Sequence, residues 1–121
     1  QHAALAAFAP ETLAILEERR AEFRRRRDYL LPALRELGFR IPVVPQGAFY
    51  IYADCSALCD DSFAFARDLL EQVGVAVTPG ADFGVNAAAC HVRFAYTCEV
   101  PRLAEGVRRI GDFLGRRPAA P

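Results

Sequence analysis

The chain has 121 residues, of which 53% are hydrophobic and 25% are charged, a balance typical of one packed domain and not of a disordered chain. Its 15 basic and 15 acidic residues cancel to a net charge of zero, so bulk charge gives no support for a nucleic-acid or membrane partner. Every basic residue is an arginine. The chain therefore has no Schiff-base lysine, no P-loop lysine and no lysine general base.

The sequence begins with Gln1 and holds no methionine, from which we expect a segment of a longer protein. Its longest uncharged apolar run, residues 41–53, is shorter than the ~18–20 residues of a membrane-spanning helix. Four cysteines accompany no visible secretion signal, and a domain of this size has no need of disulfides. We expect free thiols, a cytoplasmic location and no membrane partner.

Two helices are predicted at the start of the chain, a short one over residues 2–8 and a long one over 11–37. Apolar positions of the long segment recur every three or four residues, which is one face of a helix. Pro10 stands just before it and Gly38 just after it, as helix ends prefer. Pro32 lies inside the pattern and predicts a kink or a break near Leu31.

Strands and helices alternate after this helix. β-Branched and aromatic runs over 40–44 and 48–53, separated by Pro45-Gln46-Gly47, predict two strands joined by a tight turn. Ser62 is positioned to cap a helix that ends at Gly74, and the apolar face of that helix is predicted to consist of Phe63, Ala66, Leu69, Leu70 and Val73.

The remaining segments are a short strand over 75–78, a loop over 81–89, an alternating strand over 92–96 and a last helix that Pro101 opens. This order predicts an α+β fold. We expect a small, mainly antiparallel sheet of about four strands, with helices packed on one face and a long helix that precedes the strands in the sequence.

Two constellations of side chains suggest chemistry that we consider and set aside. The arginine run over 19–27 suggests nucleic-acid binding, but acidic residues interleave with it at helical spacing, so we expect paired charges on a solvated face and no nucleic-acid partner. Cys55, Cys59, Cys90, His91 and Cys98 have the atom types of zinc ligands, but only the first pair approaches zinc spacing. We expect inert thiols and no metal site.

Arg93 is the residue that the pattern itself singles out. If Val92, Phe94 and Tyr96 point into the core, then Arg93 and Ala95 point to the opposite face of the sheet. A guanidinium beside a small residue leaves room for a carboxylate, which it binds through two parallel hydrogen bonds. An ordinary solvent-facing arginine is the alternative at this point.

Three motifs follow one another along the chain: PQGAFY at 45–50, VAVTPGADFG at 75–84 and VRFAY at 92–96. Their order and spacing resemble the C-terminal part of the pyridoxal-phosphate-dependent aminotransferases of the aspartate aminotransferase family, class I and II, fold type I. The opening residues 1–4 look like the helix that follows the cofactor lysine of this family. The resemblance implies that residues 1–10 end the large-domain region and that 11–121 form the small domain.

The family resemblance also implies roles for individual residues. It implies that Arg93 grips the α-carboxylate of the substrate. It further implies that two segments wall the active-site cleft, with Phe49 close to that arginine; the wall residues are Gly47, Phe49, Pro79, Gly80, Phe83 and Gly84. We expect no catalytic residue in this chain.

The implied activity is transfer of an amino group between an amino acid and a 2-oxo acid, with pyridoxal phosphate as the electron sink. The Schiff-base lysine would lie before Gln1, on the missing large domain, and we expect the chain alone to be inactive. The parent protein would be a homodimer. A β-lyase or acyltransferase of the same fold, and a free-standing module that binds amino acids for regulation, are the alternatives.

Overall fold

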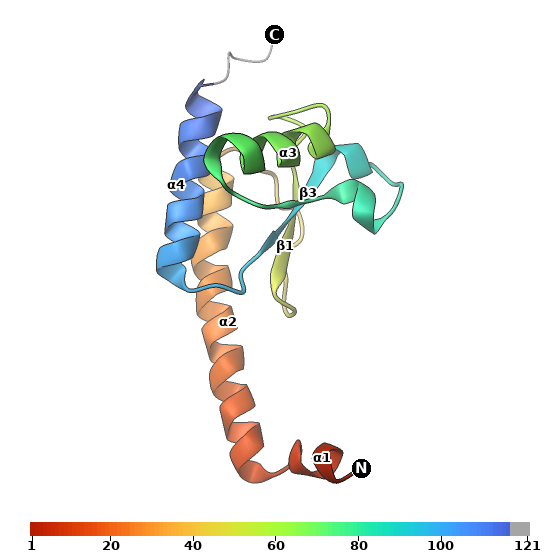
Figure 1. Cartoon of the computed structure of the whole chain (residues 1–121), viewed down its shortest axis with the longest axis vertical. Coiled ribbons are helices and arrows are strands. Elements are labelled where there is room, and N and C mark those ends of the chain that lie inside the picture. The colour runs from red at the N-terminus through yellow and green to blue at the C-terminus, as the bar shows by residue number, and fades with distance from the viewer. Residues whose placement is uncertain (117–121) are drawn as a thin grey trace.

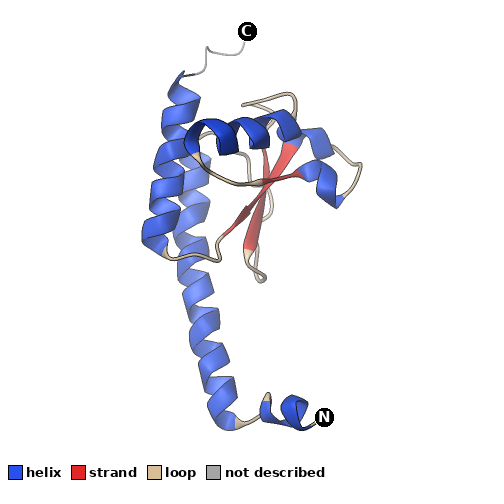
Figure 2. Cartoon of the chain, viewed as in Figure 1, coloured by secondary structure: helices blue, strands red, loops and turns tan. Residues whose placement is uncertain are grey.

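The computed structural model describes residues 1–116, and these form an α+β fold (Figures 1 and 2). The two 3₁₀ turns are Gly80–Phe83 and Ala88–Cys90. The helices and strands, in chain order, are α1 (His2–Ala6), α2 (Pro10–Glu36), β1 (Tyr50–Asp54), α3 (Ser62–Val73), β2 (Thr78–Pro79), β3 (His91–Ala95) and α4 (Val100–Arg116).

The sheet has three strands in the order β1-β3-β2, and both pairings are antiparallel. A fourth strand over 40–44, expected from the sequence, is reduced to a single bridge between Arg40 and Asp54. Pro42 and Pro45 explain the difference, because proline has no N–H to donate to a strand ladder.

Helices cover one face of this sheet and enclose the core, as expected. The C-terminal third of α2 packs beside α4, and α3 lies across the sheet (Figure 1). Alternate residues of β1 and β3 point into this core and are fully or almost fully buried: Ile51, Ala53, Val92 and Phe94. Their helical partners are Leu30, Leu31, Leu34, Phe65, Leu69, Leu103, Ile110 and Phe113.

The long helix α2 continues through Pro32 to Glu36, so the break expected near Leu31 does not occur. Proline removes one backbone hydrogen bond of the helix. The last turns of α2 carry all of its buried residues, and this packing against the core offsets the lost bond. The helix has Pro10 as its first residue and is followed by Gly38 in the left-handed region, at φ 95°, as its sequence suggested.

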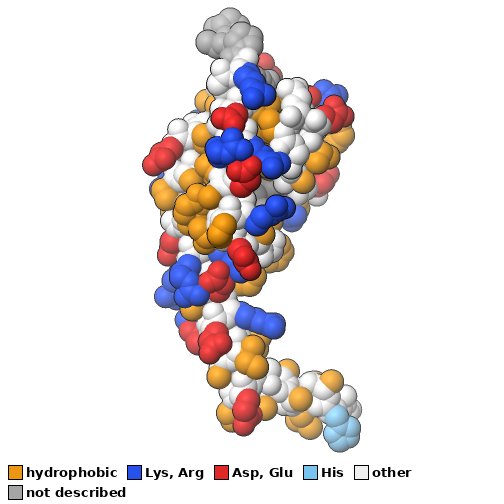
Figure 3. All heavy atoms as spheres, turned by 60° about the vertical axis from the view of Figure 1, so that its left-hand side comes forward, with side chains coloured by type: hydrophobic (Ala, Val, Ile, Leu, Met, Phe, Trp, Pro, Cys, Tyr) orange, Lys and Arg blue, Asp and Glu red, His pale blue; other side chains and the backbone are white. Residues whose placement is uncertain are grey.

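The first half of α2 and the short helix α1 project from the core as an arm (Figure 3). Neither α1 nor the part of α2 before Leu30 has a buried residue. The arm exposes large apolar side chains, namely Leu5, Phe8, Leu13, Ile15 and Leu16. No helix of residues 1–116 combines the length and the hydropathy needed to span a lipid bilayer.

Four of the six arginines in the run over 19–27 pair with acidic neighbours one to four residues away, so most of the run is paired, as predicted. These ion pairs join Arg20 to Glu17, Arg25 and Arg26 to Glu22, and Arg27 to Asp28. Pairs between residues three or four positions apart give a helix modest support, which salt screens at an exposed surface.

The cap of α3 is Asp61. The sequence-based prediction of Ser62 as the cap is wrong by one residue. The Asp61 carboxylate accepts hydrogen bonds from the backbone N–H groups of Phe63 and Ala64. Ser62 is buried, and its hydroxyl donates to the carbonyl of Ala88. The predicted apolar face of α3 is right for Ala66 and Leu69, which are buried, and wrong for Phe63 and Leu70, which are exposed; Phe65 is buried in their place.

Candidate functional site

The strand register builds the site on the sheet face that the helices leave open. Arg93 of β3 stands opposite Tyr52 of β1 on one side and Thr78 of β2 on the other. These three residues therefore form one row across the sheet. Because side chains alternate along a strand, the burial of Val92 and Phe94 in the core directs Arg93 to the other face. The sequence-based prediction for its direction is confirmed.

The Arg93 guanidinium lies between two aromatic rings and one hydroxyl. Its central carbon is 4.8 Å from the centre of the Phe83 ring and 5.6 Å from that of Tyr50. Its Nη2 donates a hydrogen bond of 3.2 Å to the hydroxyl of Thr78. A cation over the face of an aromatic ring is attracted by the ring quadrupole, so these contacts hold the guanidinium in place without neutralising its charge.

No carboxylate neutralises Arg93 within residues 1–116. The salt bridges of this region involve other arginines, and the hydrogen bond to Thr78 is the one that the Arg93 side chain makes there. Its Nε is buried and has no hydrogen-bond partner among those residues. Since a guanidinium has five N–H donors, most of its capacity to bind an anion is unused. A partly buried charge is normally paired, and Arg93 has no charged partner within residues 1–116.

Arg93 opens onto a cleft of about 510 Å³. The wall is mainly aromatic and apolar, and it consists of Tyr50, Tyr52, Phe83, Gly84, Val85, Asn86 and Arg93. Burial, and to a lesser extent nearby Cys55, raises the pKa of Tyr52, so its phenol stays protonated at neutral pH. Because the lining holds one positive charge and no acidic side chain, the cleft is suited to a single carboxylate with an apolar or aromatic remainder.

Two of the six expected wall residues line this cleft directly. Phe83 stacks against the guanidinium, and Gly84 follows it in the left-handed region at φ 143°. Pro79 lies in the edge strand β2, next to Thr78. Pro79 therefore supports the cleft through the backbone and does not line it.

Position 80 must be a glycine, because the neighbouring atoms leave no room for a side chain. A Cβ atom at this position would lie 2.7 Å from the Tyr52 hydroxyl and 2.8 Å from the His91 carbonyl oxygen, and it would also collide with the Ala88 carbonyl. The absence of a side chain brings the start of the 3₁₀ turn Gly80–Phe83 against Tyr52. Gly80 thus positions Phe83, whose ring contacts both Tyr52 and Arg93.

The turn that carries Gly47 and Phe49 is held against the end of β3 and lies beside the cleft. The Tyr96 hydroxyl lies 3.2 Å from the carbonyl oxygens of Gly47 and Ala48, and the Tyr96 N–H donates to the Phe49 carbonyl. Phe49 packs edge-on against Tyr50, which in turn lies under the Arg93 guanidinium. Phe49 thus reaches the guanidinium through Tyr50, whereas Gly47 lines a separate groove between this turn and α2.

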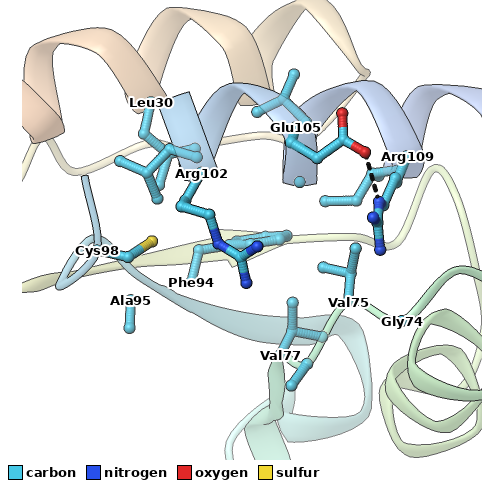
Figure 4. Close-up of a pocket in the computed structure, with 15 residues that line it drawn as sticks. Leu30, Gly74, Val75, Val77, Phe94, Ala95, Cys98, Arg102, Glu105 and Arg109 are labelled. Carbon is cyan, nitrogen blue, oxygen red and sulfur yellow. Dashed lines mark hydrogen bonds and ion pairs between the residues drawn. The ribbon is translucent and has the colours of Figure 1, made fainter. Parts of the chain in front are cut away.

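A smaller cavity of about 230 Å³ lies on the other side of β3, under α4 (Figure 4). It has an arginine of its own, Arg102, above an apolar floor that includes Phe94 and Val77. Glu105 stands at its rim and forms an ion pair with Arg109. The cavity therefore contains both signs of charge and none of the residues expected at the site.

Sequence reasoning missed four residues that line the cleft, namely Tyr50, Tyr52, Val85 and Asn86, and also Thr78, which accepts a hydrogen bond from Arg93. A signal was present for the tyrosines, because Tyr50 and Tyr52 alternate with the buried Ile51 and Ala53 and so share the open face. Nothing local in the sequence pairs Tyr52 or Thr78 with Arg93. That pairing depends on the register between strands far apart in the chain.

The chain that carries this cleft matches a known protein family. The model of the family described as "Aminotransferase class I and II" matches residues 1–110. The chain belongs to the class I and II aminotransferases. The family that the order of motifs suggested and the predicted α+β fold are therefore confirmed.

Individual relatives agree with this assignment. The chain is 39% identical over 114 residues to a valine–pyruvate aminotransferase of Mycobacterium tuberculosis, covering 94% of this chain and 29% of the relative. It is 44% identical over 103 residues to an aspartate/prephenate aminotransferase of Thermus thermophilus, a match that covers 85% of this chain and 26% of the relative. A crystal structure of an aminotransferase from M. tuberculosis superposes with a TM-score of 0.88 at 38% identity, covering 95% of this chain and 30% of that one.

These matches define how much of an aminotransferase the chain represents. It spans 26–30% of the length of these three relatives. The matched part includes the row of Arg93, Tyr52 and Thr78 and the cleft beside it.

Replacing Gly80 by alanine tests the close packing behind the cleft. We expect Gly80→Ala to lower the free energy of unfolding by about 1–3 kcal/mol, because the added methyl group must displace two carbonyls and the Tyr52 hydroxyl. Urea denaturation followed by circular dichroism measures the change. Gly106→Ala in α4 is the control for an added methyl group that meets no atom within 4 Å, and it should not lose stability. Absence of a loss of stability in Gly80→Ala would contradict the packing role of Gly80.

Proposed function

We propose that this chain is the small domain of a pyridoxal-phosphate-dependent aminotransferase, and that Arg93 binds the α-carboxylate of its amino acid or 2-oxo acid substrate. In this proposal residues 11–121 form the small domain and residues 1–10 end the large-domain region. The membership of the chain in the aminotransferase family supports the reaction class. The assignment of Arg93 is supported by the geometry of the open sheet face.

The unpaired Arg93 guanidinium carries the proposal. It is held by Thr78, Phe83 and Tyr50, its Nε is buried without a partner, and no acidic side chain of residues 1–116 pairs with it. A planar carboxylate matches the planar fork of a guanidinium through two parallel N–H donors. Both substrates of a transaminase carry a carboxylate next to the reacting carbon, so one anchor serves both halves of the reaction.

The cleft walls complete this binding step. Phe83 and Tyr50 exclude water from one side of the guanidinium, which strengthens its attraction for a carboxylate. With the carboxylate fixed at Arg93, the carbon that carries the amino or oxo group is held at a set distance from β3. Binding at a fixed orientation of this kind is a large part of how an enzyme lowers a barrier.

The residues of this chain do not themselves fit pyridoxal phosphate. Covalent attachment of the cofactor requires a lysine amine, and all 15 basic residues of the chain are arginines. When bound, the cofactor supplies the electron sink for amino-group transfer. We propose that its lysine lies on polypeptide outside these 121 residues, and that this chain contributes the substrate anchor.

The exposed arm gives the missing large domain a place to pack. Its apolar side chains, at positions 5, 8, 13, 15 and 16, lie away from the core of the small domain. In the proposed parent enzyme they are covered by the large domain. The homodimeric state that the family resemblance implies, and the cytoplasmic location expected from the free thiols, belong to the same proposal.

Replacing Arg93 tests the carboxylate anchor. In the full-length enzyme, we expect Arg93→Gln to lower kcat/KM for an amino acid by about 10- to 100-fold, because charge-assisted hydrogen bonds worth ~1.5–3 kcal/mol are lost. For the matching amino acid amide, which lacks the carboxylate charge, the variant should lose little. Steady-state kinetics with both substrates measures this discrimination. Arg102→Gln, on the other side of the sheet, is the matched control.

An equal loss for the acid and the amide would contradict the anchor role of Arg93. The same conclusion would follow if kcat/KM for the amino acid stayed unchanged. Product analysis in the same assay distinguishes the reaction class, because a transaminase releases a 2-oxo acid that retains the substrate side chain, whereas a β-lyase releases pyruvate and ammonia.

Thr78 is expected to act by positioning Arg93. Thr78→Val removes the hydroxyl that accepts from Arg93 Nη2 while keeping the shape of the side chain. We expect a several-fold higher KM for the amino acid and little change in kcat. In Thr78→Ser, which keeps the hydroxyl, KM should return to its original value. A fall in kcat without a rise in KM, or a failure of serine to restore KM, would rule out this role.

The isolated chain is expected to have no transaminase activity, since it lacks the lysine that the reaction needs. The measurement mixes the purified chain with pyridoxal phosphate, an amino acid and a 2-oxo acid, and follows formation of the second amino acid. A rate equal to that of the same mixture without protein is the expected result. Turnover above that rate would contradict the division of labour proposed between the two domains.

A further inference from the structure

Two cysteines lie within reach of one another at the end of β1, outside the Arg93 cleft. The sulfur atoms of Cys55 and Cys59 are 3.5 Å apart. The Cys59 N–H donates a 3.0 Å hydrogen bond to the Cys55 carbonyl, which closes a single helical turn between β1 and α3. Four residues of helical backbone place two Cα atoms roughly 6 Å apart. That separation lies within the range of disulfides.

The surroundings of this pair differ between the two sulfurs. Cys55 is fully buried, whereas Cys59 is half-buried and so is the sulfur that a dissolved reagent reaches first. The hydrogen bond with Cys59, together with burial, raises the pKa of the Cys55 thiol. The Cys55 N–H donates to the Cys90 carbonyl at 2.8 Å, which anchors the start of the turn to the segment before β3.

We propose that Cys55 and Cys59 form a reversible intramolecular disulfide, which makes the turn between β1 and α3 a redox-sensitive clasp. The sulfurs must approach from 3.5 Å to about 2.05 Å, a movement that rotation about the two Cα–Cβ bonds supplies. The pair is held in this arrangement by backbone hydrogen bonds, so the fold brings the two thiols together before any oxidant acts.

The reaction is a thiol–disulfide exchange with a small-molecule disulfide such as oxidised glutathione. The Cys59 thiolate attacks one sulfur of the reagent, forms a mixed disulfide and releases one molecule of reduced thiol. Cys55 then gives up its proton and attacks the Cys59 sulfur, which releases the second molecule of thiol. The two protein thiols lose two electrons in total, and the reagent disulfide gains them.

Neither cysteine lines the proposed substrate site. Cys55 directly follows Asp54, the last residue of β1, whereas the cleft residue Tyr50 begins this strand and the cleft residue Tyr52 lies at its middle. Closing the clasp ties the end of the strand to the segment that leads into Asp61, the cap of α3. An effect on the stability of this connection is therefore expected whether or not Arg93 binds a carboxylate.

Equilibration of the 121-residue chain in glutathione redox buffers tests the proposal. Acid quenching, alkylation of free thiols and peptide mapping then identify every disulfide. We expect two of the four thiols to be lost and the bond to join Cys55 to Cys59. Cys59→Ser should abolish this bond, while the double variant Cys90→Ser/Cys98→Ser should form it as the original chain does.

The unfolded chain provides the decisive comparison. In concentrated urea the same two cysteines meet by chance, so we expect the equilibrium constant for closing the disulfide to be at least tenfold larger in the folded chain. An equal or smaller constant in the folded chain would overturn the proposal, because the fold would then not favour the bond. Recovery of mixed disulfides with glutathione at Cys59 with no Cys55–Cys59 bond, or of a bond to Cys90 or Cys98, would overturn it as well.

Discussion

The site depends on a positive charge that the fold positions and leaves unpaired. Arg93 is fixed by a threonine hydroxyl and two aromatic rings, and no carboxylate of residues 1–116 pairs with it. A charged group that is removed from water and given no counter-charge costs stability. In the proposed function, an anionic ligand that binds at the open sheet face offsets this cost.

One strand accounts for both the core and the site. Val92 and Phe94 of β3 are buried against α2, α3 and α4, and this packing forces Arg93 between them to the opposite face. Antiparallel pairing with β1 and β2 then brings Tyr52 and Thr78 to its two sides. The position of the guanidinium is thus a consequence of core packing, and a shift of the register by one residue would bury it.

The features that sequence analysis predicted are those set by local periodicity. Alternation along 92–96 was enough to orient Arg93, and the three- and four-residue spacing of apolar positions was enough to find α2 and α4. The same reasoning misplaced the cap of α3 by one residue, because Asp61 and Ser62 are both good capping residues and only the three-dimensional contact of Ser62 with Ala88 distinguishes them. It also expected a strand over 40–44, where Pro42 and the adjoining Pro45 limit the pairing to a single bridge.

The features that sequence analysis missed depend on contacts between distant segments. Tyr52 and Thr78 become partners of Arg93 only through strand register, which no local pattern of this chain encodes. Gly80, expected as part of the cleft wall, instead permits a close approach of the 3₁₀ turn to Tyr52 and His91. The Cys55–Cys59 pair was set aside as inert thiols, since only the structure shows that a helical turn brings the two sulfurs to 3.5 Å.

The most direct test of the central claim is to observe the Arg93 guanidinium while a substrate carboxylate is added. In the full-length protein, the Nε–H resonance of each arginine can be followed by NMR during titration with a 2-oxo acid, with assignments from Arg93→Lys and Arg102→Lys. The account predicts a saturable shift of the Arg93 resonance and no shift of that of Arg102. Saturation of the substrate site with no change at Arg93 would contradict it.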